Sequence, residues 1–130
     1  MNSKLTNIEA RIALERAFGR DGRECDPKVV LHQIGIMEVF ALSGGKWMPI
    51  AAEDEEYGGT YYVGALLFLG HGKALEVVLD WNDTYSVRLV RRIAKGHALG
   101  TVVVATEASN VYCDELTEVC FSVAQGKVPA

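Results

Sequence analysis

The residues best suited to bind an anion are three closely spaced arginines, Arg88, Arg91 and Arg92. They fall in a segment that predicts a β-strand, and side chains four residues apart along a strand lie on the same face. Arg88 and Arg92 therefore share one face, which could contact nucleic acid or an acidic protein surface. With His71 or His97, this face is also a candidate small-molecule or nucleotide site.

A structural explanation of the same strand is the alternative. The arginine face would then simply face solvent, and the opposite face would belong to the core. The apolar residues of that opposite face are Tyr85, Val87, Leu89 and Ile93. Arg91 interrupts this apolar set, so it could lie at the end of the sheet, pair with a carboxylate such as Glu76, or mark a site. We favour the structural explanation.

Large aromatic side chains in or near predicted turns form a second candidate site. Trp47 and Trp81, with Tyr57, Tyr61 and Tyr62, could make a partner-binding surface, because exposed aromatic residues are enriched at protein interfaces. Burial of these rings in the core is the alternative. The residues predicted to bind a partner are Trp47, Trp81, Tyr57, Arg88, Arg91 and Arg92.

The sequence contains no pattern typical of catalysis or metal binding. No two of the three histidines are one helical turn apart, although they could converge in space. Cys113 and Cys120 are seven residues apart on one face of a predicted helix, where packing is favoured over nucleophilic catalysis. The acidic run 53–56 lacks the ligand pattern of a calcium loop and is interpreted as a solvated, mobile loop. We therefore predict no catalytic residue, no metal and no cofactor.

Length, composition and charge limit the possible classes of protein. A chain of 130 residues with 49% hydrophobic residues is expected to form one globular domain, residues 1–130. The net charge of −4 gives no support for binding to nucleic acid. The N-terminus lacks the apolar run of a secretory signal, and the longest apolar stretch, 61–69, is about half of the ~20 residues that a membrane-spanning helix needs. Three cysteines without a CxxC pair favour a reducing, cytoplasmic location.

Capping signals and residue periodicity predict the order of the elements. Thr6 and Glu9 fit the capping box of a first helix, with Ser3 as an alternative start, and Asp26–Pro27 begins a second helix that ends at Gly35. The predicted strands are 36–42, 46–50, 61–69, 75–79, 85–93 and 101–104, and a final helix begins at Asp114. The 61–69 strand is apolar at both parities, which predicts cover on both of its faces.

These elements predict an α+β fold. An antiparallel meander of five or six strands would pack with two N-terminal helices and one C-terminal helix. Pro49 cannot donate a ladder hydrogen bond, so the strand 46–50 is expected at an edge of the sheet. Such an edge strand could also pair with a second copy, which makes a homodimer possible.

Two stretches of the chain resemble small, uncharacterised phage and mobile-element proteins. The first is Leu31-His32-Gln33-Ile34-Gly35 followed by Val39–Lys46, and the second comprises Asp83–Arg92 and Val111–Leu116. The resemblance covers about Val29 to Gly126. It implies a compact α+β fold and a phage-encoded accessory protein that acts in the cytoplasm of a host cell, and it implies no catalytic residues.

The first functional hypothesis is thus a non-enzymatic binding protein that engages a host or phage protein. A small-molecule or nucleotide-binding module that uses the Arg88/Arg92 face is the alternative. Nucleic-acid binding ranks last because of the charge, and no membrane association is expected.

Overall fold

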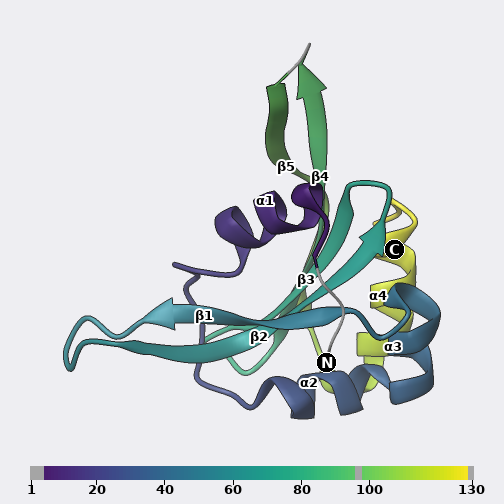
Figure 1. The fold of residues 1–130 in the computed structure, drawn as a ribbon. Coiled ribbons are helices and arrows are strands. Elements are labelled where there is room, and N and C mark those ends of the chain that lie inside the picture. The colour runs from purple at the N-terminus through teal and green to yellow at the C-terminus, as the bar shows by residue number, and fades with distance from the viewer. Residues whose placement is uncertain (1–4, 96–97, 129–130) are drawn as a thin grey trace.

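Five antiparallel strands lie side by side in a single sheet in the order in which they follow along the chain (Figure 1). The computed structural model describes residues 5–95 and 98–128. Its elements are α1 Asn7–Arg16, α2 Pro27–Ile34, α3 Ile36–Ser43, β1 Trp47–Glu53, β2 Thr60–Gly70, β3 Lys73–Leu79, β4 Tyr85–Lys95, β5 Ala98–Val111, the 3₁₀ turn η1 Cys113–Glu115 and α4 Leu116–Ala124. The predicted α+β class and the antiparallel meander are confirmed.

Both predicted N-terminal helix starts are present. The Thr6 hydroxyl accepts a hydrogen bond from the Glu9 amide at 3.2 Å, and the Thr6 amide donates to the Glu9 carboxylate at 2.9 Å, which completes the capping box. At α2, Asp26 precedes Pro27, the first residue of the helix, and its carboxylate accepts a hydrogen bond from the Lys28 amide at 3.0 Å. These local contacts satisfy amides that have no partner within the helix.

A third N-terminal helix replaces a predicted strand. The segment 36–42 was expected to be extended because of its β-branched and aromatic residues, but it forms α3. Gly35, with φ 110° and ψ 130°, ends α2 and redirects the chain into α3. Val39 is then buried on the core side while Met37 and Phe40 are exposed. Strand propensity reflects the packing of a half-buried surface, and here packing at helical spacing prevails.

Helices cover both faces of the sheet (Figure 1). On one face, α2, α3 and α4 pack on the odd-numbered residues of β3 and β4, such as Leu75, Val77 and Val87. On the other face, α1 packs on Ala74, Val78 and Val90. The expectation that the arginine face of β4 is open to solvent is therefore wrong, because Val90 lies on that face and is buried under α1. The prediction that 61–69 is covered on both sides is confirmed, since 63–68 are all buried.

The last strand is longer than predicted. The sequence suggested 101–104, whereas β5 runs from Ala98 to Val111 and pairs along β4 with three interruptions of register. The final helix begins as the 3₁₀ turn η1 and continues as α4, whose Leu116, Val119, Cys120 and Val123 are buried. Among the described residues, no helix is long and apolar enough to cross a membrane.

Candidate functional site

Three segments that are far apart in the sequence enclose a cleft at one end of the sheet. They are the linker 19–24 between α1 and α2, the loop 53–60 between β1 and β2, and Trp81 in the turn between β3 and β4. Two adjoining hollows of about 570 and 660 Å³ make up the cleft. The side chains common to both are Asp54, Glu56, Tyr61 and Trp81. We call this feature the acidic cleft.

Backbone hydrogen bonds fix the linker against the sheet. The Arg20 amide donates to the Ala51 carbonyl at 3.1 Å, and the Arg23 amide donates to the Leu79 carbonyl at 2.8 Å. Gly22 lies between these anchors, and a Cβ there would be 2.8 Å from the Leu79 carbonyl oxygen. Only a glycine lets the linker approach the sheet so closely. One wall of the acidic cleft is therefore held in place by the sheet itself.

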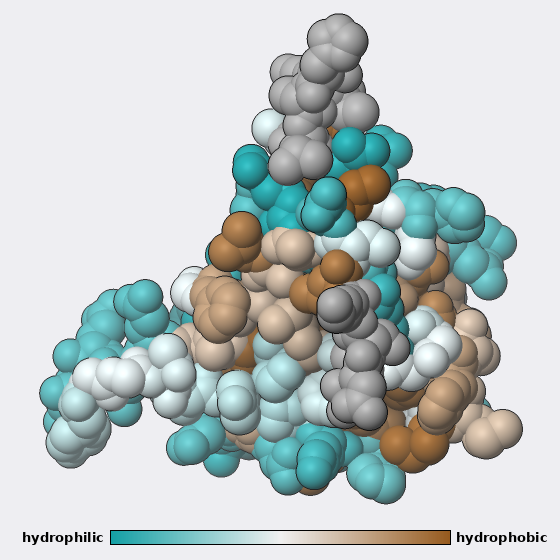
Figure 2. Space-filling model, in the orientation of Figure 1, coloured by the Kyte–Doolittle hydropathy of each residue, from teal (hydrophilic) through white to brown (hydrophobic). Residues whose placement is uncertain are grey.

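The loop 53–60 is an ordered turn that is built around one carboxylate. Asp54 accepts hydrogen bonds from the amides of Glu56 and Tyr57 at 3.1 and 3.0 Å, and its own amide donates to the Gly59 carbonyl at 3.0 Å. Gly58 and Gly59 have φ values of 76° and 79°, which non-glycine residues rarely adopt. The loop thus presents Tyr57 and neighbouring acidic side chains in a defined arrangement, and its surface is hydrophilic (Figure 2).

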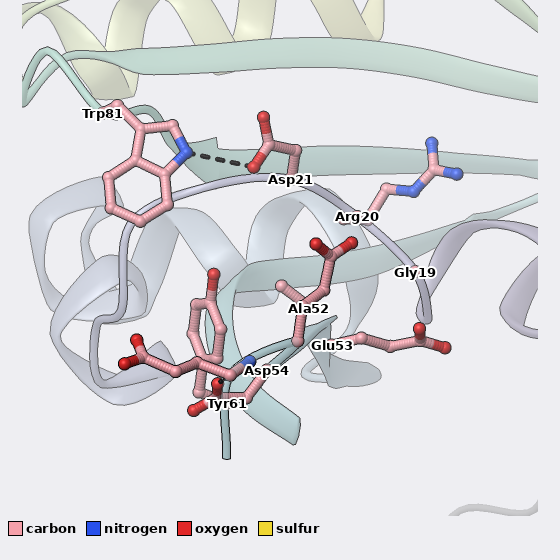
Figure 3. A pocket seen from close by; sticks show the side chains of 10 residues that line it. Gly19, Arg20, Asp21, Ala52, Glu53, Asp54, Tyr61 and Trp81 are labelled. Carbon is pink, nitrogen blue, oxygen red and sulfur yellow. Dashed lines mark hydrogen bonds between the residues drawn. The ribbon is translucent and has the colours of Figure 1, made fainter. Parts of the chain in front are cut away.

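Trp81 forms the opposite side of the cleft. Its indole Nε1–H donates to the Asp21 carboxylate at 3.0 Å, across 60 residues of sequence, yet the residue is 63% exposed. Close by, Arg23 forms an ion pair with Asp83 of the same turn. Figure 3 shows Trp81 and Asp21 on one side of the cleft, with Tyr61 and Asp54 on the other.

The charge of the cleft is strongly negative. Its lining carries six carboxylates and two guanidinium groups. The acidic residues are Asp21, Glu24, Glu53, Asp54, Glu55 and Glu56. Of the two arginines, Arg23 is already paired, and the guanidinium group of Arg20 points away from Asp54 and Tyr61 (Figure 3). Carboxylates combined with aromatic faces are suited to bind a cation.

The structure brings only part of the predicted partner surface together. Trp81 and Tyr57, which is 83% exposed, both line the acidic cleft, as does Tyr61. Trp47 lies at the other end of β1, opposite Leu67, where it packs partly buried against the core beneath α2, α3 and α4. Tyr62 is exposed and does not line the cleft. The two tryptophans therefore belong to different parts of the molecule.

Arg88 lies beneath α1 in an ion-pair cluster, away from the acidic cleft. Its guanidinium group donates to the fully buried carboxylate of Glu76 at 3.0 Å and also pairs with Glu107. Arg16 of α1 binds the same Glu76 through Nε at 2.7 Å and Nη2 at 3.1 Å. Burial alone would lower the pKa of Arg88, but its hydrogen bond to Glu107 and the charge of Glu76 outweigh burial and raise it.

Arg20 approaches this cluster from the linker. Its Nε is buried and has no hydrogen-bond partner within the described part of the chain. Desolvation, followed by the neighbouring charge of Arg16, lowers the pKa of Arg20. Arg16 and Arg88 thus pair with Glu76, and Arg88 also pairs with Glu107; of these two carboxylates only Glu76 is completely buried.

The other two predicted arginines lie at the far end of β4. Arg91 is exposed and lies opposite Lys73 in the sheet, so the suggested pairing with Glu76 is wrong, and Arg88 takes that place. Arg92 is on the face of α1 and is partly buried, with its amide bonded to the Gly72 carbonyl at 2.9 Å. Arg88 and Arg92 share a face, as predicted.

The histidines and cysteines do not gather into a site. His32 and His71 are exposed and lie on different elements, and His97 lies outside the described residues. Within residues 5–95 and 98–128, no three histidine, cysteine or acidic side chains are placed to hold a metal ion. Cys113 is exposed while Cys120 is buried, so the prediction that they share a face is wrong. Burial raises the pKa of Cys120 to about 12, which suppresses its reactive thiolate form.

Comparison with known proteins gives no match. No family model, no curated protein and no solved structure matches the chain.

The acidic residues of the cleft were missed as site residues. From sequence alone, the acidic run 53–56 is typical of a solvated loop. The available signal was the run of four acidic residues directly before Tyr57 and two glycines. The contribution of Asp21 and Glu24 depends on a chain path that only the folded structure provides.

Proposed function

We propose that this chain is a non-enzymatic binding protein whose acidic cleft holds a lysine- or arginine-rich segment of a partner protein. The observation that carries the proposal is the meeting of six carboxylates with Trp81, Tyr57 and Tyr61 around two adjoining hollows. The partner is proposed to be a host or phage protein in a bacterial cytoplasm, in line with the resemblance to small phage and mobile-element proteins.

The chemistry of the cleft suits a side chain that is cationic at its tip and apolar along its stem. An ammonium or guanidinium group over the face of Trp81 is attracted by about 0.5–2 kcal/mol, and its methylene groups can pack on the ring edges. Negative potential in a cleft also speeds the approach of a positively charged partner. Trp81 is therefore proposed as the central anchor and the carboxylates as the surrounding electrostatic guide.

The geometry gives less support to a nucleotide site on the Arg88/Arg92 face. Arg88 already binds two carboxylates, and α1 lies over the same face. A nucleotide phosphate there would have to displace an established ion pair from a partly buried position. Nucleic acid is also disfavoured at the acidic cleft, because phosphates and carboxylates repel.

Replacing Trp81 with alanine tests the proposal directly. A fluorescein-labelled hexa-arginine peptide serves as the probe and is titrated with wild-type protein and with the Trp81→Ala variant by fluorescence anisotropy. We expect the variant to bind about 5–30-fold more weakly, which corresponds to a loss of about 1–2 kcal/mol of cation–aromatic contact. Affinity of the wild-type protein should also fall as salt is added, because exposed charges are screened.

Phe40 of α3 provides a matched control, because it is an exposed aromatic residue on a different element. Phe40→Ala should leave the affinity for the peptide unchanged, and a hexa-glutamate peptide should not bind. Equal affinity of wild-type and Trp81→Ala protein would refute the role of the cleft. If Trp81→Ala weakens peptide binding as expected, a basic host protein that copurifies with the wild-type protein but not with Trp81→Ala would be identified as the partner.

A further inference from the structure

The outer edge of β5 is the longest unpaired strand edge in the described structure. β5 is the last strand in the sheet order, so only its β4 side is paired along Ala98–Val111. Its single charged residue is Glu107, and it contains no proline or lysine. Edge strands usually carry such residues because unpaired amides and carbonyls are a template for pairing with another chain. The segment 101–106 (TVVVAT) contains no charged residue and no proline.

The opposite edge of the sheet is protected. β1 has half as many residues, 7 against 14, and contains Pro49. The linker covers part of it, since the Ala51 amide donates to the Ala17 carbonyl at 2.8 Å and the Ala51 carbonyl accepts from Arg20. The edge strand predicted from sequence as a possible dimer contact, 46–50, thus lies on the protected side. If the protein self-associates through its sheet, β5 is the edge available for it.

The first part of the free edge, residues 98–102, lies on a part of the sheet that has little support. β3 pairs with β4 only as far as Arg91, and the end of β4 and the start of β5 project beyond the other strands as a two-stranded ribbon (Figure 1). Isolated two-stranded ribbons are marginally stable in water. Ile93 on this ribbon is 38% exposed, and Val104, which lies opposite Val90 at the base of the ribbon, is 42% exposed. Addition of further strands would bury apolar side chains and satisfy backbone groups together.

We propose that β5 pairs antiparallel with β5 of a second copy of this chain, about a two-fold axis at Val103, which extends the sheet to ten strands. The register follows from the faces. Val102 and Val104 lie opposite Arg92 and Val90, both on the α1 side of the sheet. A two-fold axis at Val103 places Val102 of one copy opposite Val104 of the other, so apolar side chains meet on the same face. The same contact is made twice, as a closed dimer requires.

A cysteine at the axis tests both the dimer and its register. Val103 would face its own counterpart, and opposed residues in antiparallel strands have Cα atoms about 4.5–5.5 Å apart, within disulfide range. The Val103→Cys variant is made in a Cys113→Ser background, because Cys113 is exposed. Mild oxidation should cross-link it into a covalent dimer. Thr101→Cys in the same background is the control, since four residues of offset place its counterpart about 13 Å away.

The mass of the unmodified protein provides an independent readout. Sedimentation of wild-type protein should give the dimer mass at high concentration, and Val103→Lys should give the monomer mass with unchanged circular dichroism, because two lysines would face each other. A monomer mass at every concentration overturns the proposal, as does cross-linking of Val103→Cys no faster than Thr101→Cys. Neither result bears on the acidic cleft, because hexa-arginine binding is measured separately.

Discussion

Replacing Glu76 with alanine is expected to lower the free energy of unfolding by about 3–5 kcal/mol, because it leaves buried cations without a counter-charge. The carboxylate is 0% exposed and binds Arg16 and Arg88, whose side chains are only 17% and 24% exposed. Arg20 is near enough for the charges of Arg16, Glu76 and Arg88 to influence it. Urea unfolding followed by circular dichroism measures the change.

Two further variants separate charge from packing. Glu107→Gln removes an anion that also pairs with Arg88 but is 45% exposed, so we expect a loss of no more than about 1 kcal/mol. Joint replacement of Arg16, Glu76 and Arg88 with methionine, leucine and methionine should recover most of the loss, since apolar groups can substitute for a whole buried ion pair. Comparable stability of Glu76→Ala and Glu107→Gln would contradict the expectation that buried cations without a counter-charge cause the loss.

Gly64→Ala is expected to cause the second large loss, about 3 kcal/mol or more, at the upper end of the range for overpacking. A Cβ at Gly64 would lie 1.9 Å from the Val77 carbonyl oxygen, which belongs to the neighbouring strand β3. Backbone cannot rotate away as a side chain can, so β2 and β3 would have to separate. The thermal midpoint should fall by many degrees.

Gly19→Ala is the matched glycine control. Its φ of 69° imposes left-handed strain, but a Cβ there would have no neighbour within 4 Å. We expect this variant to lose only about 1 kcal/mol. A Gly64→Ala protein that is as stable as Gly19→Ala would show that the strands tolerate the added methyl group, and the tight approach would then have no energetic role.

Local signals were sufficient for most of the sheet and for the helix starts. The strand 61–69 is apolar at both parities, and it proved to be covered by helices on both sides. The capping contacts of Thr6 and Asp26 involve only neighbours within a few positions, so they could be predicted from the sequence. The meander order follows because consecutive strands joined by short turns tend to pair.

Features that depend on distant contacts could not be predicted. The segment 36–43 has residues of high strand propensity, but it forms a helix because its packing against the sheet favours helical spacing. The role of Arg88 depends on α1 crossing its face, and this places Arg16 beside Glu76 from 60 residues away. Likewise, the acidic cleft exists because the linker and loop 53–60 meet in space. Residue types and their spacing along the sequence do not show which distant segments will be in contact.

The anchoring of the linker 19–24 to the sheet has a consequence for the order of folding. Each strand pairs with its neighbour along the chain, so the sheet can assemble through short loop closures, whereas Ala17–Ala51 and Asp21–Trp81 join distant points. We therefore expect α1 and the linker to dock late and to open before the sheet unfolds. Native-state hydrogen exchange should find α1 amides less protected than those of β2 and β3. Equal protection would argue against this order. A cationic segment bound in the cleft would then favour the docked state. Its binding would therefore make the opening of α1 less frequent, although the segment does not contact α1 directly.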